Sequence, residues 1–220
     1  MKHQDLINEK STLWIFGYGS LVWKPGFAFK KSKIGYIKGF KRRFWHGDDF
    51  HRGDKEKPGR VVTLVPDHEA CTWGVAYEVA ESQIEESLQY LNWREVVLGG
   101  YIKEVVEFIP KERSHSPLLA LVYIATSDNP IYLGPASAKD IATQISICRG
   151  NTGHNIEYLL RLAEFMRRHC PEAEDEHLFS IEAAVMNIVH DCAEIKPSDQ
   201  KSLLLGAVQT FAHGTPHLVL

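Results

Sequence analysis

The chain has 220 residues, a net charge of -3 and a hydrophobic content of 44%. This length suffices for one well-buried domain and leaves little for a second. The ordinary composition argues against a disordered chain or a membrane span, and the lack of a basic excess argues against a nucleic-acid-binding protein.

Residues 1–12 are polar and mixed in charge, without the apolar core of a signal peptide, and are predicted to form a short N-terminal extension. The cysteines are widely spaced and form no Cys-x-x-Cys pair; they are Cys71, Cys148, Cys170 and Cys192. This spacing favours reduced thiols over a disulfide framework or a zinc site. We therefore expect a cytoplasmic location and no metal.

Strands dominate the predicted elements of the first half of the chain. An apolar run at residues 13–16 stops at Gly17-Tyr18-Gly19-Ser20, which is typical of a buried strand entering a tight loop. Further strands are predicted at residues 34–45, 61–65 and 72–79, with a surface loop at 48–59 and a turn at 66–69.

The second half changes from strands to helices. Ser82 and Glu85 form a capping-box pattern ahead of a helix, which is followed by strands at 101–109 and 118–125. Helices are then predicted at 137–148, at 155–169 (ended by Pro171) and at 175–190, with Asp175 as an N-cap. Strands first and helices later indicate an α+β fold rather than alternating βαβ units.

Glu95 is the residue whose position carries the most chemical information. On the helix after Ser82, the apolar residues Ile84, Leu88 and Leu91 recur on one face. Glu95 is the next member of that series and should point inward, where burial and the helix C-terminus both raise a carboxylate pKa. Such a group suits proton transfer. A structural ion pair with an arginine would explain the position equally well.

Two other stretches are candidates for substrate binding. In the loop Gly17-Tyr18-Gly19-Ser20-Leu21, glycines allow backbone N–H groups to converge on an anion, although most such stretches are only turns. It matches neither a dinucleotide fingerprint nor a nucleophile elbow. The basic and aromatic stretch at 41–46, continued by His51, Arg52 and Arg60, suits carboxylate recognition, or else forms an edge strand with solvated charges.

A series of short motifs runs along residues 13–188, and they are Phe16-Gly17-Tyr18-Gly19-Ser20-Leu21-Val22-Trp23, Arg42-Arg43-Phe44-Trp45, His51-Arg52-Gly53, Pro58-Gly59-Arg60-Val61-Val62-Thr63-Leu64, Trp73-Gly74-Val75-Ala76-Tyr77, Arg94-Glu95, Gly99-Gly100-Tyr101, Asn129-Pro130, Tyr132-Leu133-Gly134-Pro135, Gly153-His154-Asn155 and Asp175-Glu176-His177-Leu178. Together and in this order they resemble the motifs of the ChaC family, the glutathione-specific γ-glutamylcyclotransferases. The four residues between Glu95 and Gly99 resemble the longer-spaced branch of the family. Lys41 and His46 depart from its pattern, in which serine and glutamine are usual.

The resemblance implies a γ-glutamylcyclotransferase-like fold, a mixed β-barrel or sheet with surrounding helices. It also implies a single catalytic domain at 13–192, followed by a tail of unknown role at 193–220. The implied reaction is a lyase reaction that converts glutathione to 5-oxoproline and cysteinylglycine, without a cofactor. The implied site residues are Glu95 for proton transfer and, for substrate binding, Phe16, Gly17, Tyr18, Gly19, Ser20, Leu21, Arg42 and Arg43.

Two alternatives to this function stay open at the level of sequence. The first is a cyclotransferase for other γ-glutamyl amino acids or amines, and the second is a non-catalytic binding module that keeps the fold. The expected partner in the main reading is a small molecule, with no nucleic acid and no membrane.

Overall fold

A computed structural model of the chain describes residues 12–92 and 101–194. Five strands close into a barrel in the order β1-β3-β2-β4-β5, and β6 and β7 form a small separate sheet. In chain order the elements are β1 (Thr12–Gly17), η1 (Ser20–Val22), β2 (Lys31–Asp48), β3 (Gly59–Ala80), η2 (Glu81–Gln83), α2 (Ile84–Leu91), β4 (Tyr101–Pro110), β5 (Leu118–Ala125), α3 (Ala138–Ile147), β6 (Arg149–Gly150), β7 (Gly153–His154), α4 (Asn155–His169) and α5 (Glu176–Glu194).

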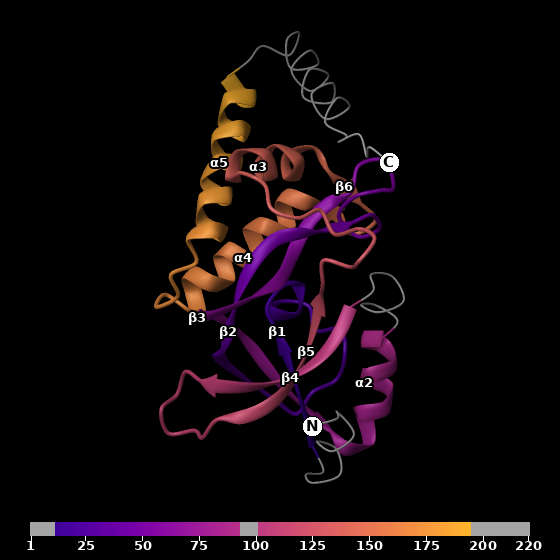
Figure 1. Cartoon of the computed structure of the whole chain (residues 1–220), viewed down its shortest axis with the longest axis vertical. Coiled ribbons are helices and arrows are strands. Elements are labelled where there is room, and N and C mark those ends of the chain that lie inside the picture. Colours follow the sequence, from indigo (N-terminus) through magenta and orange to yellow (C-terminus); the bar gives the residue numbers. More distant parts are fainter. Residues whose placement is uncertain (1–11, 93–100, 195–220) are drawn as a thin grey trace, which may run out of the picture.

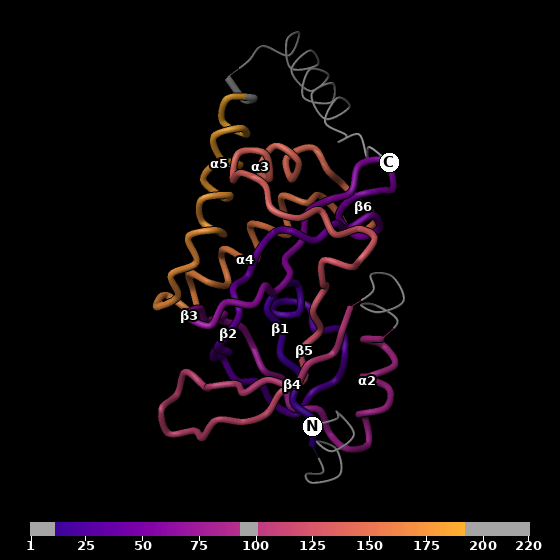
Figure 2. The backbone as a smooth tube through the Cα atoms, in the orientation of Figure 1, coloured from indigo at the N-terminus to yellow at the C-terminus, as the bar shows by residue number. Residues whose placement is uncertain are grey.

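The barrel is closed by a parallel contact between β1 and β5, at Ile15 and Leu121, whereas the other neighbours are antiparallel. Helices α3, α4 and α5 gather at one end of the molecule, and α2 lies beside the barrel near the other end (Figure 1). The long strands β2 and β3 extend from the barrel to the three helices (Figure 2). The α+β class predicted from the sequence is confirmed.

Two groups of buried apolar side chains hold the barrel and helices together. The larger group joins the barrel to α3, α4 and α5 and includes Phe16 and Phe108, whose ring centroids are 5.7 Å apart. The smaller group lies between β1 and α2 and includes Ile15, Ile84 and Leu91. Strand β1 supplies both groups because successive side chains of a strand point to opposite faces.

Most predicted elements are confirmed to within a few residues, and both helix caps of the second half are present. These elements are the strands at 13–16, 34–45, 101–109 and 118–125, the surface loop after residue 48, and the helices at 137–148, 155–169 and 175–190. The Ser137 hydroxyl accepts the Asp140 N–H (3.1 Å), and the Asp175 carboxylate accepts the Leu178 N–H (3.1 Å).

The predicted turn at residues 66–69 is wrong, because β3 is one continuous strand. Both of its halves pair with β2, where Lys38 faces Cys71 and Phe40 faces Pro66. Residues 67–70 therefore bulge opposite the single residue Gly39, which has a φ of +84° that favours glycine.

The capping box predicted at Ser82 is also wrong. Residues Glu81–Gln83 form a 3₁₀ turn, α2 begins only at Ile84, and its cap residue Gln83 makes no side-chain capping bond. The inward apolar face is confirmed at Ile84 and Leu91. Glu95, the predicted continuation of that face, lies outside the described residues.

Candidate active site

The loop after β1 forms a short 3₁₀ turn that is anchored by two tyrosines. The Tyr18 hydroxyl donates to the Tyr123 carbonyl on β5 (2.8 Å), and the Tyr77 hydroxyl donates to the Leu21 carbonyl (2.7 Å). The Ser20 carbonyl accepts the Lys24 N–H (2.9 Å) and so closes the turn. The turn is thus held in one position by buried hydrogen bonds from the barrel.

Glycine is required in this turn by close packing rather than by a positive φ. A Cβ at Gly19 would lie 2.7 Å from the Tyr158 hydroxyl and 2.9 Å from a Val62 methyl, and a Cβ at Gly17 would lie 2.6 Å from the Leu21 Cβ. The four described glycines with positive φ lie elsewhere in the chain. Gly19 therefore lets the turn pack against β3 and α4, and Gly17, at the end of β1, lets the turn fold back close to the strand.

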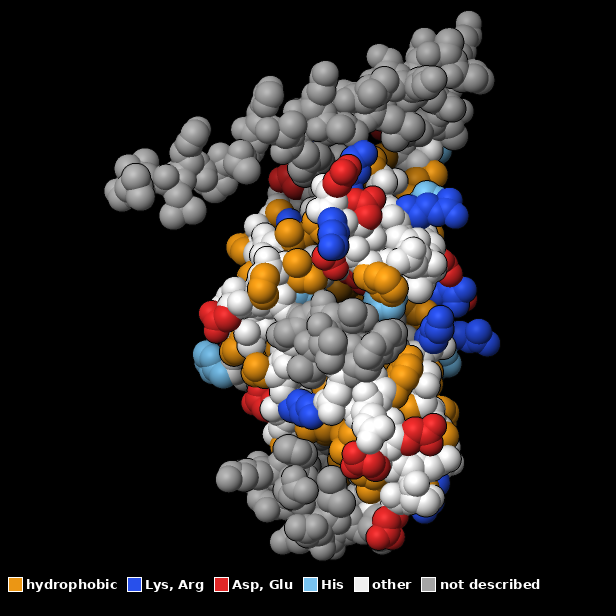
Figure 3. Space-filling model, turned by 90° about the vertical axis from the view of Figure 1, so that its right-hand side faces the viewer, with side chains coloured by type: hydrophobic (Ala, Val, Ile, Leu, Met, Phe, Trp, Pro, Cys, Tyr) orange, Lys and Arg blue, Asp and Glu red, His pale blue; other side chains and the backbone are white. Residues whose placement is uncertain are grey.

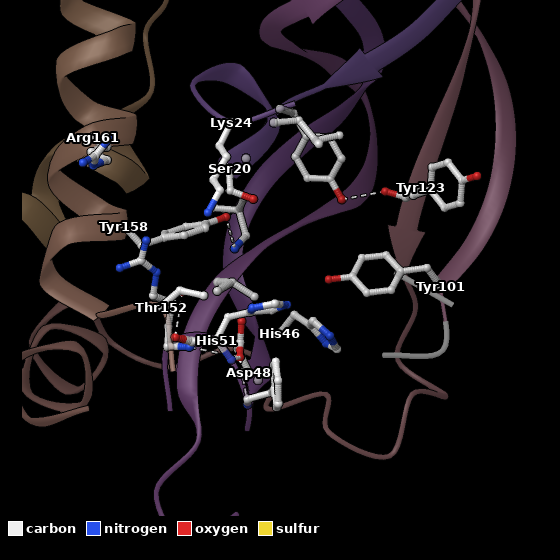
Figure 4. Close-up of a pocket in the computed structure, with 18 of the residues that line it drawn as sticks. Ser20, Lys24, His46, Asp48, His51, Tyr101, Tyr123, Thr152, Tyr158 and Arg161 are labelled. Carbon is white, nitrogen blue, oxygen red and sulfur yellow. Dashed lines mark hydrogen bonds between the residues drawn. The ribbon is translucent and has the colours of Figure 1, made fainter. Parts of the chain in front are cut away.

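A cavity of about 380 Å³ opens beside this turn, and its volume falls in the range of small-molecule sites. Its walls include the turn itself, residues 46–52, the β4–β5 region and α4 (Figure 4), together with Val61 and Val62 of β3 and Tyr90 of α2. Its polar and aromatic lining includes Tyr18, Ser20, Lys24, His46, Asp48, His51, Arg52, Tyr101, Tyr123, Thr152, Glu157, Tyr158 and Arg161.

The wall at residues 46–52 is shaped by one carboxylate. One oxygen of Asp48 accepts the backbone N–H groups of Phe50 (3.0 Å), His51 (2.6 Å) and Arg52 (3.2 Å). Three such bonds order a segment that has no regular secondary structure. Asp48 thereby fixes the position from which Arg52 reaches the cavity.

His46 forms a neutral part of this wall. Its side chain is buried beside the ring of Tyr101, with ring centroids 5.2 Å apart. Burial lowers the pKa of His46 to about 4, against the opposing charge of Asp48. Its Nδ1 makes no hydrogen bond to any residue in the described ranges 12–92 and 101–194. The ring is therefore uncharged at neutral pH.

Neither of the two arginines predicted to bind substrate lines the cavity. Arg42 is buried and pairs with Asp175 through Nε (2.8 Å), while its Nη1 donates to the Tyr18 carbonyl (2.6 Å). Arg43 donates to the carbonyl of Arg42 (2.8 Å). The Arg42 guanidinium is already bonded to protein groups, and these bonds join the turn after β1 to the start of α5.

Arg52 and Arg161 are the arginines that the structure does bring to the cavity. Arg52 donates to Glu157 Oε2 (2.9 Å) and to the His154 carbonyl (3.0 Å). Arg161, one helical turn after Glu157 on α4, donates from Nε to the other oxygen, Oε1 (2.8 Å). The Arg52 bond and both guanidinium charges lower the pKa of Glu157, so this carboxylate is ionised at neutral pH.

The structure thus brings together five of the predicted site residues: Phe16, Tyr18, Gly19, Ser20 and Leu21. Gly17 lies in the same turn but outside the lining, and Glu95 lies outside the described residues. Both described neighbours of the segment that holds Glu95 are near the cavity. Tyr101 lines it, and Asn92 accepts a hydrogen bond from the lining residue Tyr123 (3.4 Å).

Tyr158 and Arg161 are lining residues that the sequence reasoning missed. Both lie on α4, where the sequence predicts a helix with an apolar stripe but no site residue. Their spacing of three residues places them on adjacent positions of one helix face, which is a usable signal. The spacing does not show whether that helix face points toward the turn after β1, which lies more than 130 residues earlier in the chain.

A second cavity lies away from the turn, between α4 and α5, and its lining includes Met166, Phe179 and Met186. Acidic and basic side chains both appear across the face drawn in Figure 3. No group of three or more His, Cys, Asp or Glu in residues 12–92 and 101–194 is placed to hold a metal ion. Among the helices described, none is long and apolar enough to span a membrane.

Comparison with known proteins gives consistent matches over nearly the whole chain. A zebrafish (Danio rerio) protein named glutathione-specific gamma-glutamylcyclotransferase 1 is 68% identical over 186 residues, 84% of this chain and 95% of the relative. The human protein of the same name is 58% identical over 177 residues, 80% of each chain. A yeast crystal structure, described as a gamma-glutamyl cyclotransferase specific to glutathione, superposes with a TM-score of 0.73 at 29% identity, covering 81% of this chain and 99% of that one.

The likeness in structure agrees with the family expected from the motifs. The yeast enzyme shares the fold over almost its full length, which confirms the predicted cyclotransferase-like architecture. The profile of the family described as ChaC-like protein matches residues 13–188. The chain therefore belongs to the ChaC-like family.

Proposed function

We propose that the chain cleaves glutathione by intramolecular cyclisation, releasing 5-oxoproline and cysteinylglycine. The main support for this proposal is the 68% identity to the zebrafish protein named glutathione-specific gamma-glutamylcyclotransferase 1, over 95% of that protein. The cavity beside the Tyr18–Leu21 turn supports it, because its size and mixed polar and aromatic lining suit a small peptide.

The reaction needs no nucleophile from the protein. The α-amine of the glutamyl group attacks its own γ-carbonyl carbon, forming the ring C–N bond, and the bond to the cysteinyl nitrogen then breaks. The glutamyl ammonium loses two protons on becoming the ring amide N–H, and the cysteinyl nitrogen gains two on leaving as an ammonium group, so a single carboxylate can relay protons from the first nitrogen to the second. Holding the bent glutamyl conformer lowers the barrier because the attack is within one molecule.

We assign the proton transfer to Glu95. Its place after Arg94 and ahead of Gly99-Gly100-Tyr101 matches the family's catalytic glutamate. On either side of residues 93–100, Tyr101 lines the cavity and Asn92 is hydrogen-bonded to the lining residue Tyr123, which supports this assignment. The rigid turn at Gly19 and Ser20 would hold the glutamyl end of the substrate and its developing oxyanion.

The test is a comparison of Glu95→Gln with Glu104→Gln, a matched change on the exposed Glu104 of β4. We expect Glu95→Gln to lower kcat for 5-oxoproline formation by at least about 100-fold, because the amide keeps the shape but accepts no proton. The control should retain full turnover. Near-normal kcat in a folded Glu95→Gln protein would refute the role of Glu95.

The same assay tests the substrate. Purified protein is incubated with glutathione or γ-glutamylalanine, and 5-oxoproline is quantified. We expect glutathione to be preferred, whereas equal turnover of both would favour a general γ-glutamyl cyclotransferase. We also place the activity in the cytoplasm, where thiols stay reduced, as are the described cysteines Cys71, Cys148 and Cys170.

A further inference from the structure

The cavity contains a cationic cluster that the cyclisation chemistry does not use. It consists of Arg52 and Arg161 bridged by Glu157, each arginine bonded to a different carboxylate oxygen. Two positive charges and one negative charge leave the cluster with a net charge of +1. All three residues line the cavity, and they come from the loop after β2 and from α4.

Both guanidinium groups keep donors for a ligand. Arg52 uses only Nη1 for its bonds to Glu157 and the His154 carbonyl, and Arg161 uses only Nε. Within the described residues, the other guanidinium nitrogens of this pair make no hydrogen bond. A planar guanidinium with unused N–H groups matches the geometry of a carboxylate.

Several contacts hold the cluster in a defined position. Arg52 is only 8% exposed, and its guanidinium position is set by Glu157, by a backbone carbonyl and by the Asp48-ordered loop. The ion pair of Arg161 with Glu157 is half exposed, with side chains 52% and 41% accessible. An exposed ion pair of this kind contributes little to the free energy of unfolding, so folding stability does not explain why an arginine stands at position 161.

We propose that Arg52 and Arg161 form a subsite for the glycyl carboxylate of glutathione. This inference rests on the proposed function, which places the glutamyl end at the Tyr18–Leu21 turn. The glycyl carboxylate lies at the opposite end of the tripeptide and leaves with the second product. Arg161 lies on α4 with Tyr158 (Figure 4), and its side chain is the most exposed of the cluster, at 52% against 41% for Glu157 and 10% for Arg52. The glycyl end, which leaves with the second product, is the end expected nearest to solvent.

The subsite would make the enzyme select a tripeptide. A γ-glutamyl dipeptide carries its second carboxylate one residue nearer the scissile amide and would not reach the same donors. Binding energy gained at the far carboxylate also orients the glutamyl group at the turn. Arg52 and Arg161 are therefore specificity-determining residues rather than participants in proton transfer.

The experiment compares glutathione with its glycyl monoethyl ester, in which that carboxylate is neutral. Wild-type protein should prefer glutathione at least about tenfold in kcat/KM, the effect expected of a charge-assisted bidentate contact. Arg161→Gln should lower kcat/KM for glutathione about tenfold, mainly through KM, and should change the ester by less than about twofold. Arg168→Gln, an exposed arginine of the same helix outside the cavity, should change neither.

The outcomes separate the subsite from the activity itself. Equal losses for both substrates in Arg161→Gln, or a wild-type protein that does not discriminate against the ester, would overturn the subsite. Failure of wild-type protein to turn over either substrate would instead refute the proposed function. Arg161 is half exposed, so Arg161→Gln should unfold near the wild-type melting temperature. If it unfolds at a clearly lower temperature, the preference of the wild-type protein for glutathione over the ester decides whether the subsite exists.

Discussion

At the scale of single residues, the arginines of this chain show how structure assigns roles that composition cannot. Arg42 lies in the basic and aromatic stretch at residues 41–46, yet its guanidinium contacts Asp175, the Tyr18 carbonyl and the Met166 sulfur. Arg52, a few residues later, reaches the cavity. Sequence predicts that some arginine meets a carboxylate, but the choice depends on which partners the fold places nearby.

Ser20 is the residue most easily mistaken for a nucleophile. We expect no glutamyl ester on Ser20, because the substrate carries its own amine and an intramolecular attack outruns a weakly activated hydroxyl. Ser20→Ala should lower turnover without abolishing it. Mass spectrometry of the intact protein during turnover, with hydroxylamine as a trap, checks this. A Ser20 adduct or γ-glutamyl hydroxamate would refute direct cyclisation.

At the scale of elements, short sequence patterns predicted the helix ends that depend only on neighbouring residues. Caps at Ser137 and Asp175 and the proline after α4 set helix ends through neighbouring residues alone, and those ends were predicted well. The turn at 66–69 was predicted wrongly because β3 pairs with β2 on both sides of the bulge at residues 67–70, through Pro66 and Cys71. The cap at Ser82 failed because a 3₁₀ turn precedes α2.

The start of α5 combines a local cap with a distant ion pair. Asp175 caps the helix and also pairs with Arg42, whose side chain is only 2% exposed. Asp175→Asn keeps a good cap but leaves a buried guanidinium unpaired. We expect it to lower the free energy of unfolding by about 3 kcal/mol. Asp175→Ala should cost about 1 kcal/mol more, because it also removes the cap.

Urea unfolding measures both changes, with Ser137→Ala as the control for a cap alone. That control should cost about 1 kcal/mol. If Asp175→Asn costs no more than Ser137→Ala, then the Arg42 pair contributes little and the argument from burial is wrong.

At the scale of the whole molecule, the site is assembled from segments far apart in the chain. The motif after β1 could be found in the sequence because its glycines and serine are adjacent. Tyr158, Arg161 and Tyr123 meet it only through the barrel closure and the docking of α4. The sequence therefore predicted the fold class, most elements and one wall of the cavity, while the opposite walls required the tertiary arrangement.

The docking of α5 onto the barrel should make the stability of the whole molecule depend on pH. The Phe44 N–H on β2 donates to His177 Nε2 (3.0 Å), so this nitrogen must be unprotonated. Burial and, to a smaller extent, the charges of Arg43, Arg60 and Arg42 together lower the pKa of His177 to about 4, with Asp175 opposing them. Burial lowers the pKa of His46 similarly, to about 4, with Asp48 opposing.

A histidine whose pKa is lower in the folded state binds its proton more readily when unfolded. From the ordinary value of 6.5 down to about 4, the unfolded chain takes up the proton while the folded chain does not. The stability that His177 supports is therefore present above pH 6.5 and is lost as the pH falls toward 4. Its contribution to the slope is at most about 1.4 kcal/mol per pH unit.

We expect His177→Gln to reduce this pH dependence, because a glutamine oxygen can accept the Phe44 N–H without titrating. Urea unfolding of both proteins at pH 7, 6 and 5 gives the slopes, and the wild-type slope should be the steeper one. Carboxylates also titrate near this range, but they are common to both proteins and cancel in the difference. His68→Gln, at a side chain that is 91% exposed, serves as the control and should follow the wild type. Parallel wild-type and His177→Gln lines would show that protonation of His177 does not undo the contact between α5 and β2.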